Sequence, residues 1–236
     1  MLNIIRICVL SLIALQPAFA GGHITGSGNI KSEKRSISGA KYLVNQTPAK
    51  VILTTGSNEQ IVVETDDNLI NFVNTYVRDH QLFVTMSDCS FSTKYMVVYA
   101  TLKDINGIKV KGSGDVVTRG YFKTNALKLL VQGSGNIDVS NASTNKVTIA
   151  IVGSGDIKIG GETNTLEAEI KGSGDISTES LRVNSANIFI SGSGDCTLNT
   201  ANALNVKILG SGTVYLHRKP SNLKYSIAGS GSIERY

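Results

Sequence analysis

A short glycine motif recurs along most of this 236-residue chain. Its consensus is Gly-Ser-Gly-Asp, with Asn, Thr or Ser in place of Asp in some copies. The eight copies begin at Gly26, Gly112, Gly133, Gly153, Gly172, Gly192, Gly210 and Gly229. The last seven follow one another every 18 to 21 residues. This period is too short for helical-pair repeats or propeller blades, but it suits one turn of a β-solenoid.

Apolar and polar residues alternate around each motif. In one repeat the apolar or small residues occupy seven consecutive odd positions: Leu127, Leu129, Val131, Gly133, Gly135, Ile137 and Val139. Such strict alternation is typical of extended chain with one buried face. We therefore expect both motif glycines to face inward, at a corner that has no room for a Cβ or needs a positive φ. The expected corner glycines are Gly112, Gly114, Gly133, Gly135, Gly153, Gly155, Gly172, Gly174, Gly192, Gly194, Gly210, Gly212, Gly229 and Gly231.

Each repeat is predicted to run as strand, glycine corner, strand and polar turn. The polar turns are expected at segments such as 141–145 and 160–165, which are rich in turn-forming residues. Residues 31–105 lack the repeat but contain strand-like runs, and we expect them to cap one end of the stack. The predicted fold is all-β: a single-stranded, right-handed β-helix, or β-solenoid, with coils of about 20 residues and an N-terminal β cap region. Residues 106–236 would form the coils of a single domain that covers 21–236.

The first twenty residues have the pattern of a secretory signal peptide. Arg6 lies in a short polar start, 7–15 form an apolar core, and Ala18-Phe19-Ala20 fits a small-x-small cleavage site. We expect residues 1–20 to be removed and the mature chain to be exported to the periplasm, the outer surface or the medium. No later stretch approaches 18 consecutive apolar residues, so a membrane-spanning helix is not expected.

Charge and cysteine content narrow the function classes. The formal net charge is +5, and the basic residues are scattered without interleaved aromatic residues, so nucleic-acid binding is not expected. The three histidines are isolated, and neither a metal site nor a cofactor is predicted. Cys196 takes the inward position that isoleucine holds in other repeats, so we expect it to pack as a small apolar residue. A disulfide between Cys89 and Cys196 is the alternative.

Stacking in register would turn equivalent positions into columns, with one coil every ~4.8 Å. The outward column beside the glycine corner is mostly acidic and holds Asp115, Asn136, Asp156, Asp175 and Asp195. Together with Ser113 from the parallel column of motif serines, it forms the recognition ladder that we predict. A bound cation such as calcium would relieve repulsion between stacked carboxylates, and so would hydrogen bonds from serines and backbone N–H groups. The Gly-Gly-x-Gly-x-Asp nonapeptide of calcium-binding β-rolls does not occur in the sequence, which favours the hydrogen-bonded ladder.

Several segments together resemble the head GIN domain family of auto-transporter adhesins. They are Gly26-Ser27-Gly28-Asn29, Glu-Thr-Asp-Asp-Asn-Leu at 64–69, Val-Val-Tyr-Ala-Thr-Leu at 97–102 and Gly112-Ser113-Gly114-Asp115, followed by the repeats. The resemblance covers nearly the whole chain after residue 20. It implies an exported β-helical domain of adhesin type, and it supplies no catalytic residues.

These observations favour a non-enzymatic binding or adhesion module of the bacterial cell envelope or surface. Its partner would be a glycan, an envelope polymer or a surface protein, contacted through polar columns that include Thr144, Asn145, Asn164, Thr165, Asn184 and Ser185. The alternatives are a carbohydrate-active enzyme built on a β-helix and a purely structural envelope protein. An enzyme is disfavoured because the acids recur as part of the repeat, whereas a catalytic pair should differ in environment. Because the last repeat carries no cap of its own, self-association into a homo-oligomer is a further expectation.

Overall fold

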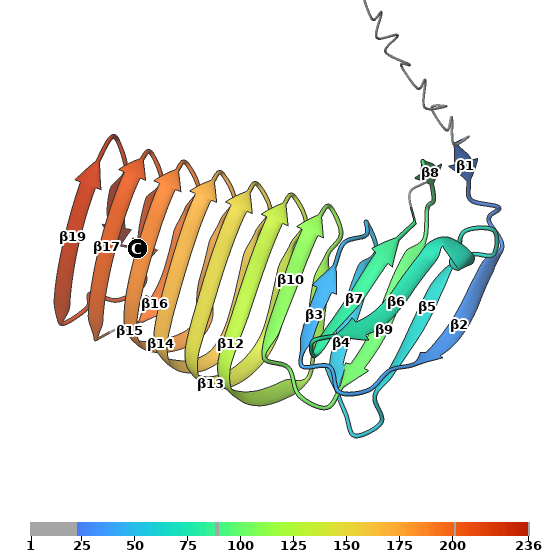
Figure 1. Ribbon diagram of the computed structural model, residues 1–236. Helices are drawn as coiled ribbons and strands as arrows, with labels where there is room; N and C mark the ends of the chain where they lie inside the picture. The colour runs from blue at the N-terminus through green and yellow to red at the C-terminus, as the bar shows by residue number, and fades with distance from the viewer. Residues whose placement is uncertain (1–22, 88–89, 201, 236) are drawn as a thin grey trace, which may run out of the picture.

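The computed structural model describes residues 23–87, 90–200 and 202–235. They form strands joined by tight corners (Figure 1), and the 3₁₀ turn η1 (Ile70–Phe72) is the only helical segment among them. No helix in this part of the chain is long and apolar enough to cross a membrane. The predicted signal peptide and Cys89 lie outside the described residues. The strands are β1 (Ile24–Thr25), β2 (Ile30–Ser36), β3 (Tyr42–Asn45), β4 (Lys50–Thr55), β5 (Gln60–Asp66), β6 (Val73–Arg78), β7 (Gln81–Met86), β8 (Phe91–Ser92), β9 (Met96–Leu102), β10 (Gly107–Gly112), β11 (Val116–Arg119), β12 (Tyr121–Gly133), β13 (Ile137–Gly153), β14 (Ile157–Gly172), β15 (Ile176–Gly192), β16 (Cys196–Thr200), β17 (Ala203–Gly210), β18 (Thr213–Leu216), β19 (Asn222–Ala228) and β20 (Ser232–Arg235).

Successive repeats stack as parallel coils. Strands β12 to β15 pair in parallel, with Gly133 opposite Gly153 and Gly153 opposite Gly172. On one side of the stack the pairing continues through β17 and β19, and on the other through β16, β18 and β20. The predicted β-solenoid is therefore confirmed, with about six turns at a spacing of about 20 residues.

Each coil has three straight segments. In β13, buried and outward-facing residues alternate, and two consecutive exposed residues mark a corner at 140–141 and another at 145–146. The polar turns predicted at 141–145 and 160–165 are wrong, because both stretches are extended and pair in parallel with the next coil. Ala142 and Thr144 are buried and continue the alternation between the two corners. The turn-like composition of this segment thus reflects its exposed side chains and not its backbone.

Branched apolar side chains fill the interior of the coils. Ile137, Ile157 and Ile176 form one column, and each is at most 1% exposed. Cys196 continues this column as a free, fully buried thiol. Because equivalent side chains of successive coils pack on one another, the burial of each coil depends on its neighbours.

The region predicted as an N-terminal cap contributes two further coils. Strand β3 pairs in parallel with β10 and β7, and β4 pairs in parallel with β11 and β9. Beyond them the pairing becomes antiparallel, with β5 on β9, β2 on β5 and β6 on β7. These antiparallel strands lie at one end of the parallel stack (Figure 1).

An asparagine replaces the glycine corner in the coil formed by β3 and β4. The Asn45 amide is fully buried, donates to the carbonyl of Ala49 at 3.0 Å and accepts from the backbone N–H of Thr47 at 3.0 Å. A Cβ on Gly114, in the next coil, would lie 2.2 Å from the Thr47 carbonyl oxygen. Coils with and without the motif therefore pack against each other at the same corner.

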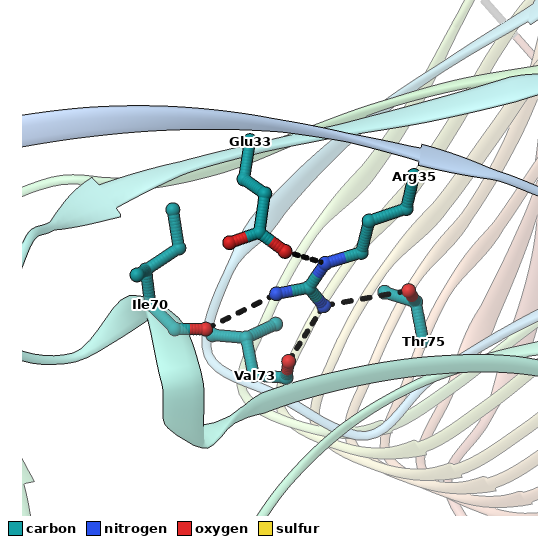
Figure 2. A network of polar contacts seen from close by, with 5 residues as sticks. All are labelled: Glu33, Arg35, Ile70, Val73 and Thr75. Atoms are coloured by element: carbon teal, nitrogen blue, oxygen red, sulfur yellow. Dashed lines mark hydrogen bonds and ion pairs between the residues drawn. The ribbon is translucent and has the colours of Figure 1, made fainter.

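Arg35 joins the outermost strands of the N-terminal end (Figure 2). Its Nε donates to Glu33 at 2.7 Å, its Nη1 to the carbonyl of Val73 at 2.6 Å and its Nη2 to the carbonyl of Ile70 at 3.2 Å. Among the described strands, β2 pairs only with β5, and β6 only with β7. Arg35 therefore links two strands that no backbone ladder connects.

At the opposite end, β19 and β20 are the outermost described strands. Most side chains of β19 are exposed, including Tyr225 at 66%. The expected self-association through this end stays a prediction.

Candidate functional site

In most coils neither glycine of the motif has room for a side chain. The first, such as Gly153, has a φ of +137°, in the region that favours glycine, and a Cβ there would lie 2.2 Å from the carbonyl oxygen of Gly133 in the preceding coil. The second, such as Gly155, is buried, and a Cβ there would lie 2.0 Å from the carbonyl oxygen of Gly135 in the preceding coil. We predicted that both glycines face inward, but the first ones are exposed or half-exposed because they form the outer bend of the corner.

The acidic column forms a hydrogen-bonded ladder beside these glycines. In each step, the Oδ1 of one residue accepts a hydrogen bond from the backbone N–H of the equivalent residue in the next coil. The steps are Asn136 to Asp115 at 3.0 Å, Asp156 to Asn136 at 2.9 Å, Asp175 to Asp156 at 2.9 Å, Asp195 to Asp175 at 2.8 Å and Thr213 to Asp195 at 2.7 Å. The column therefore satisfies one backbone N–H per coil at a corner between strands.

The structure thus brings Asp115, Asn136, Asp156, Asp175 and Asp195 into one column, with the exposed Ser113 at the start of the same corner. Within the described ranges, no group of three or more His, Cys, Asp and Glu side chains is arranged to hold a metal ion. The geometry accounts for the acids as links between coils, and recognition by this column stays a prediction.

A groove of about 810 Å³ runs along the stack at a different corner, the one at 145–146 in β13. It is lined by three-residue stretches from successive coils, 123–125, 143–145, 162–164 and 182–184, and by Asn202. We call it the asparagine groove. Because the lining positions repeat from coil to coil, the groove crosses the strands and follows the solenoid axis.

One asparagine from each coil lines this groove: Asn125, Asn145, Asn164, Asn184 and Asn202. Asn145 Nδ2 donates to Asn125 Oδ1 at 2.6 Å, Asn164 to Asn145 at 3.3 Å and Asn202 to Asn184 at 2.7 Å. Each bond uses one of the two N–H groups of the donor and one of the two lone pairs of the acceptor. Every amide therefore keeps hydrogen-bonding capacity that a ligand can use.

Threonine hydroxyls fix the corner beneath the asparagines. Thr144 Oγ1 donates to the carbonyl of Lys146 at 3.0 Å, and Thr163 Oγ1 donates to the carbonyl of Thr165 at 3.1 Å. Both threonines are buried, at 8% and 6% exposure. The amides consequently stand on a corner that is held by side chains as well as by backbone pairing.

A polar chain crosses the groove beside the asparagines. Ser143 Oγ donates to Glu162 Oε1 at 3.0 Å, and Arg182 Nη2 lies 3.2 Å from Glu162 Oε2. Both charged side chains are exposed, so their ion pair adds only about 0–1 kcal/mol to stability, and the remaining guanidinium donors stay available. Three of the asparagines were expected from the sequence, but Glu162 and Arg182 were not, although each stands two residues before an asparagine of the column.

The first copy of the motif, at Gly26, does not join the glycine column. It folds against Asp66, whose carboxylate accepts hydrogen bonds from Thr93 Oγ1 at 2.5 Å and from the backbone N–H of Gly28 at 2.6 Å. Both bonds lower the pKa of Asp66, and the bond from Thr93 has the larger effect. This copy therefore ties the start of the described chain to the cap.

The family model described as "Putative auto-transporter adhesin, head GIN domain" matches residues 42–220. The chain belongs to this head GIN domain family. The resemblance predicted from the motifs is thereby confirmed, and the match spans coils with and without the glycine motif.

Crystal structures of bacterial proteins share the fold of this head GIN domain chain. A putative adhesin from Bacteroides fragilis NCTC 9343 has a TM-score of 0.86 at 24% identity, covering 90% of this chain and 100% of its own. A putative adhesin from Parabacteroides distasonis ATCC 8503 has a TM-score of 0.75 at 21% identity, covering 91% of this chain and 100% of its own. A protein from the same strain, described as a putative lipid binding protein, has a TM-score of 0.76 at 20% identity with the same coverage. No curated protein sequence matches the chain.

Proposed function

We propose that this chain is an exported, non-enzymatic binding module of the bacterial cell envelope or surface, and that it holds an extended glycan polymer in the asparagine groove. The observation that carries the proposal is the repetition of amide side chains along a groove of about 810 Å³. The adhesin description of the family and the predicted signal peptide at 1–20 support the same role.

The groove suits a polymer better than a single small molecule. Amides both donate and accept hydrogen bonds, as sugar hydroxyl groups do, and one amide recurs with each coil, about every 4.8 Å. A rigid scaffold also lowers the entropy lost on binding, because the side chains are ordered beforehand. A linear glycan laid along the solenoid axis would therefore meet a similar set of groups at each coil.

The acidic ladder does not favour an enzyme. Its carboxylates all occupy equivalent positions and accept the same kind of hydrogen bond from the next coil. A general acid and its partner carboxylate need environments that separate their pKa values. The relatives named above are described as adhesins or as a lipid-binding protein, and this agrees with a binding role.

A lipid ligand, suggested by the description of one relative, would need apolar space. The interior of the coils is filled by side chains such as Ile137 and Ile157, which are at most 1% exposed, and the asparagine groove is lined mainly by polar residues. We therefore expect no binding to phospholipid vesicles, which serve as a negative control.

The proposal is tested by binding of the purified chain to an array of glycans and envelope polymers and to phospholipid vesicles. A groove variant, Asn145→Ala with Arg182→Ala, is compared with a ladder variant that carries Asp115→Asn, Asp156→Asn, Asp175→Asn and Asp195→Asn. The ladder variant should fold, because Asn136 already makes the ladder bond with an amide oxygen. Selective glycan binding that the groove variant loses and the ladder variant keeps is expected.

Loss of binding in the ladder variant alone would show that the acidic column, and not the asparagine groove, binds the polymer. Cleavage of a bound polymer would replace the binding role with an enzymatic one. Binding to no polymer on the array would contradict the proposal and leave a structural role in the envelope.

A further inference from the structure

The ladder of asparagines has one break. Hydrogen bonds join Asn125 to Asn145, Asn145 to Asn164 and Asn184 to Asn202, but among the described residues none joins Asn164 to Asn184. In the unbroken steps the Nδ2 of the later asparagine donates to the Oδ1 of the earlier one. The break therefore leaves Asn164 Oδ1 without its donor and Asn184 Nδ2 without its acceptor.

The break coincides with a change in the corner below it. Thr144 and Thr163 each bond the carbonyl two residues later, but the next coil has Val183 at the equivalent position. Valine has no hydroxyl, so the corner that carries Asn184 lacks this hydrogen bond. Val183 lines the groove but is only 4% exposed, so a substitution there mainly changes the corner.

We infer that the break between Asn164 and Asn184 is a subsite for the acetamido group of an N-acetylated sugar in a β-1,4-linked chain. The inference rests on the proposed function and names the class of glycan. A secondary amide offers one N–H donor and one carbonyl acceptor, which match the free oxygen of Asn164 and the free N–H of Asn184. The ligand would thereby complete the missing step of the ladder.

The surroundings fit a sugar ring around that amide. Glu162 and Arg182 belong to the same two coils as Asn164 and Asn184 and line the same groove. The exposed carboxylate accepts from ring hydroxyls, and the guanidinium donates to them. A ring in an extended β-1,4-linked chain advances by nearly the coil spacing, so neighbouring rings would reach Asn145 and Asn202.

The test measures the affinity of the full chain for an N-acetylglucosamine pentamer and for cellopentaose, which has the same linkage but a hydroxyl in place of each acetamido group. We expect the acetylated pentamer to bind about five- to tenfold more tightly, the worth of one to two hydrogen bonds. Asn184→Asp, which removes the donor, should abolish this preference. Asn205→Asp, the same change at an exposed position of β17 outside the groove, should leave it intact.

Val183→Thr supplies a second test, which changes the buried corner below the asparagines and keeps Asn164 and Asn184 themselves. The new hydroxyl should restore the hydrogen bond at the corner and bring Asn184 into hydrogen-bonding contact with Asn164. The preference for the acetylated pentamer should then fall about five- to tenfold. Val152→Thr, the same substitution at an exposed position outside the groove, is the matched control.

Equal affinity for the two pentamers, or an unchanged preference in Asn184→Asp, would overturn the subsite while leaving glycan binding in place. Binding of an extended Gly-Ala peptide but of neither sugar would overturn the choice of a sugar amide. Absence of binding to every polymer on the array would instead contradict the proposed function itself.

Discussion

Arg35 of β2 donates a hydrogen bond of 2.6 Å to the carbonyl oxygen of Val73, the first residue of β6. The two strands are the edges of the N-terminal end, and the guanidinium also contacts Glu33 and Ile70. A solenoid exposes its core and its strand edges at each end unless something covers them. This arginine therefore joins the two edge strands of the antiparallel cap.

Arg35→Ala should lower the free energy of unfolding by about 1–3 kcal/mol, because it leaves two carbonyls without a charged donor. The change is measured as a shift of the midpoint in a urea titration. Lys34→Ala, an exposed change on the same strand, is the control and should stay within about 0.5 kcal/mol of the parent chain. An equal effect of both variants would contradict a specific role for Arg35.

The second glycine of the motif should tolerate no side chain. Gly155→Ala would place a methyl group 2.0 Å from a backbone oxygen that cannot move alone, so we expect a loss of more than about 4 kcal/mol or failure to fold. Gly120→Ala is the matched control, because its φ is +83° but its Cβ would meet nothing within 4 Å. That variant should lose only about 1–2 kcal/mol, and thermal unfolding of the two proteins compares them.

The acidic ladder should depend on its acceptor oxygen more than on its charge. Asp175→Ala removes the acceptor for the backbone N–H of Asp195 and should cost about 0.5–1.5 kcal/mol. Asp175→Asn keeps an acceptor and removes one of several stacked charges, so its stability should equal or exceed that of the parent chain. Chemical denaturation of both variants distinguishes the two effects, and a larger loss for Asn than for Ala would be inconsistent with the ladder bond.

Burial, with a smaller contribution from Asp175 and Asp195, raises the pKa of Cys196 from 9.0 to about 12. The folded chain therefore favours the neutral thiol, and this part of the stability is fully present below pH 9 and falls as the pH rises from 9 toward 12. In a Cys89→Ser background, Cys196 should resist alkylation at pH 8 until denaturant is added, as peptide mapping of the label would report. Rapid labelling of the native protein would contradict this burial, and a Cys89 to Cys196 disulfide in the parent chain would contradict the free thiol.

The stack of coils could be predicted from the repeat itself. A period near 20 residues, with alternation on both sides of a glycine pair, allows only extended segments that bury every second residue, and the register follows from aligning the glycines. The acidic column was predictable for the same reason, because residues at one offset from a corner must lie above one another.

Interactions between coils decided the structural features that the repeat does not predict. Residues 141–145 have the composition of a turn, yet their backbone pairs with the next coil as a strand because Ala142 and Thr144 are buried. The coil of β3 and β4 has no glycine motif, and only its pairing with β10 and β11 reveals it. The link from Arg35 to Val73 and the break between Asn164 and Asn184 each join or separate residues 20 or more positions apart. Sequence periodicity reports which face of a strand is buried, but only packing of one coil on the next determines which polar groups find a partner.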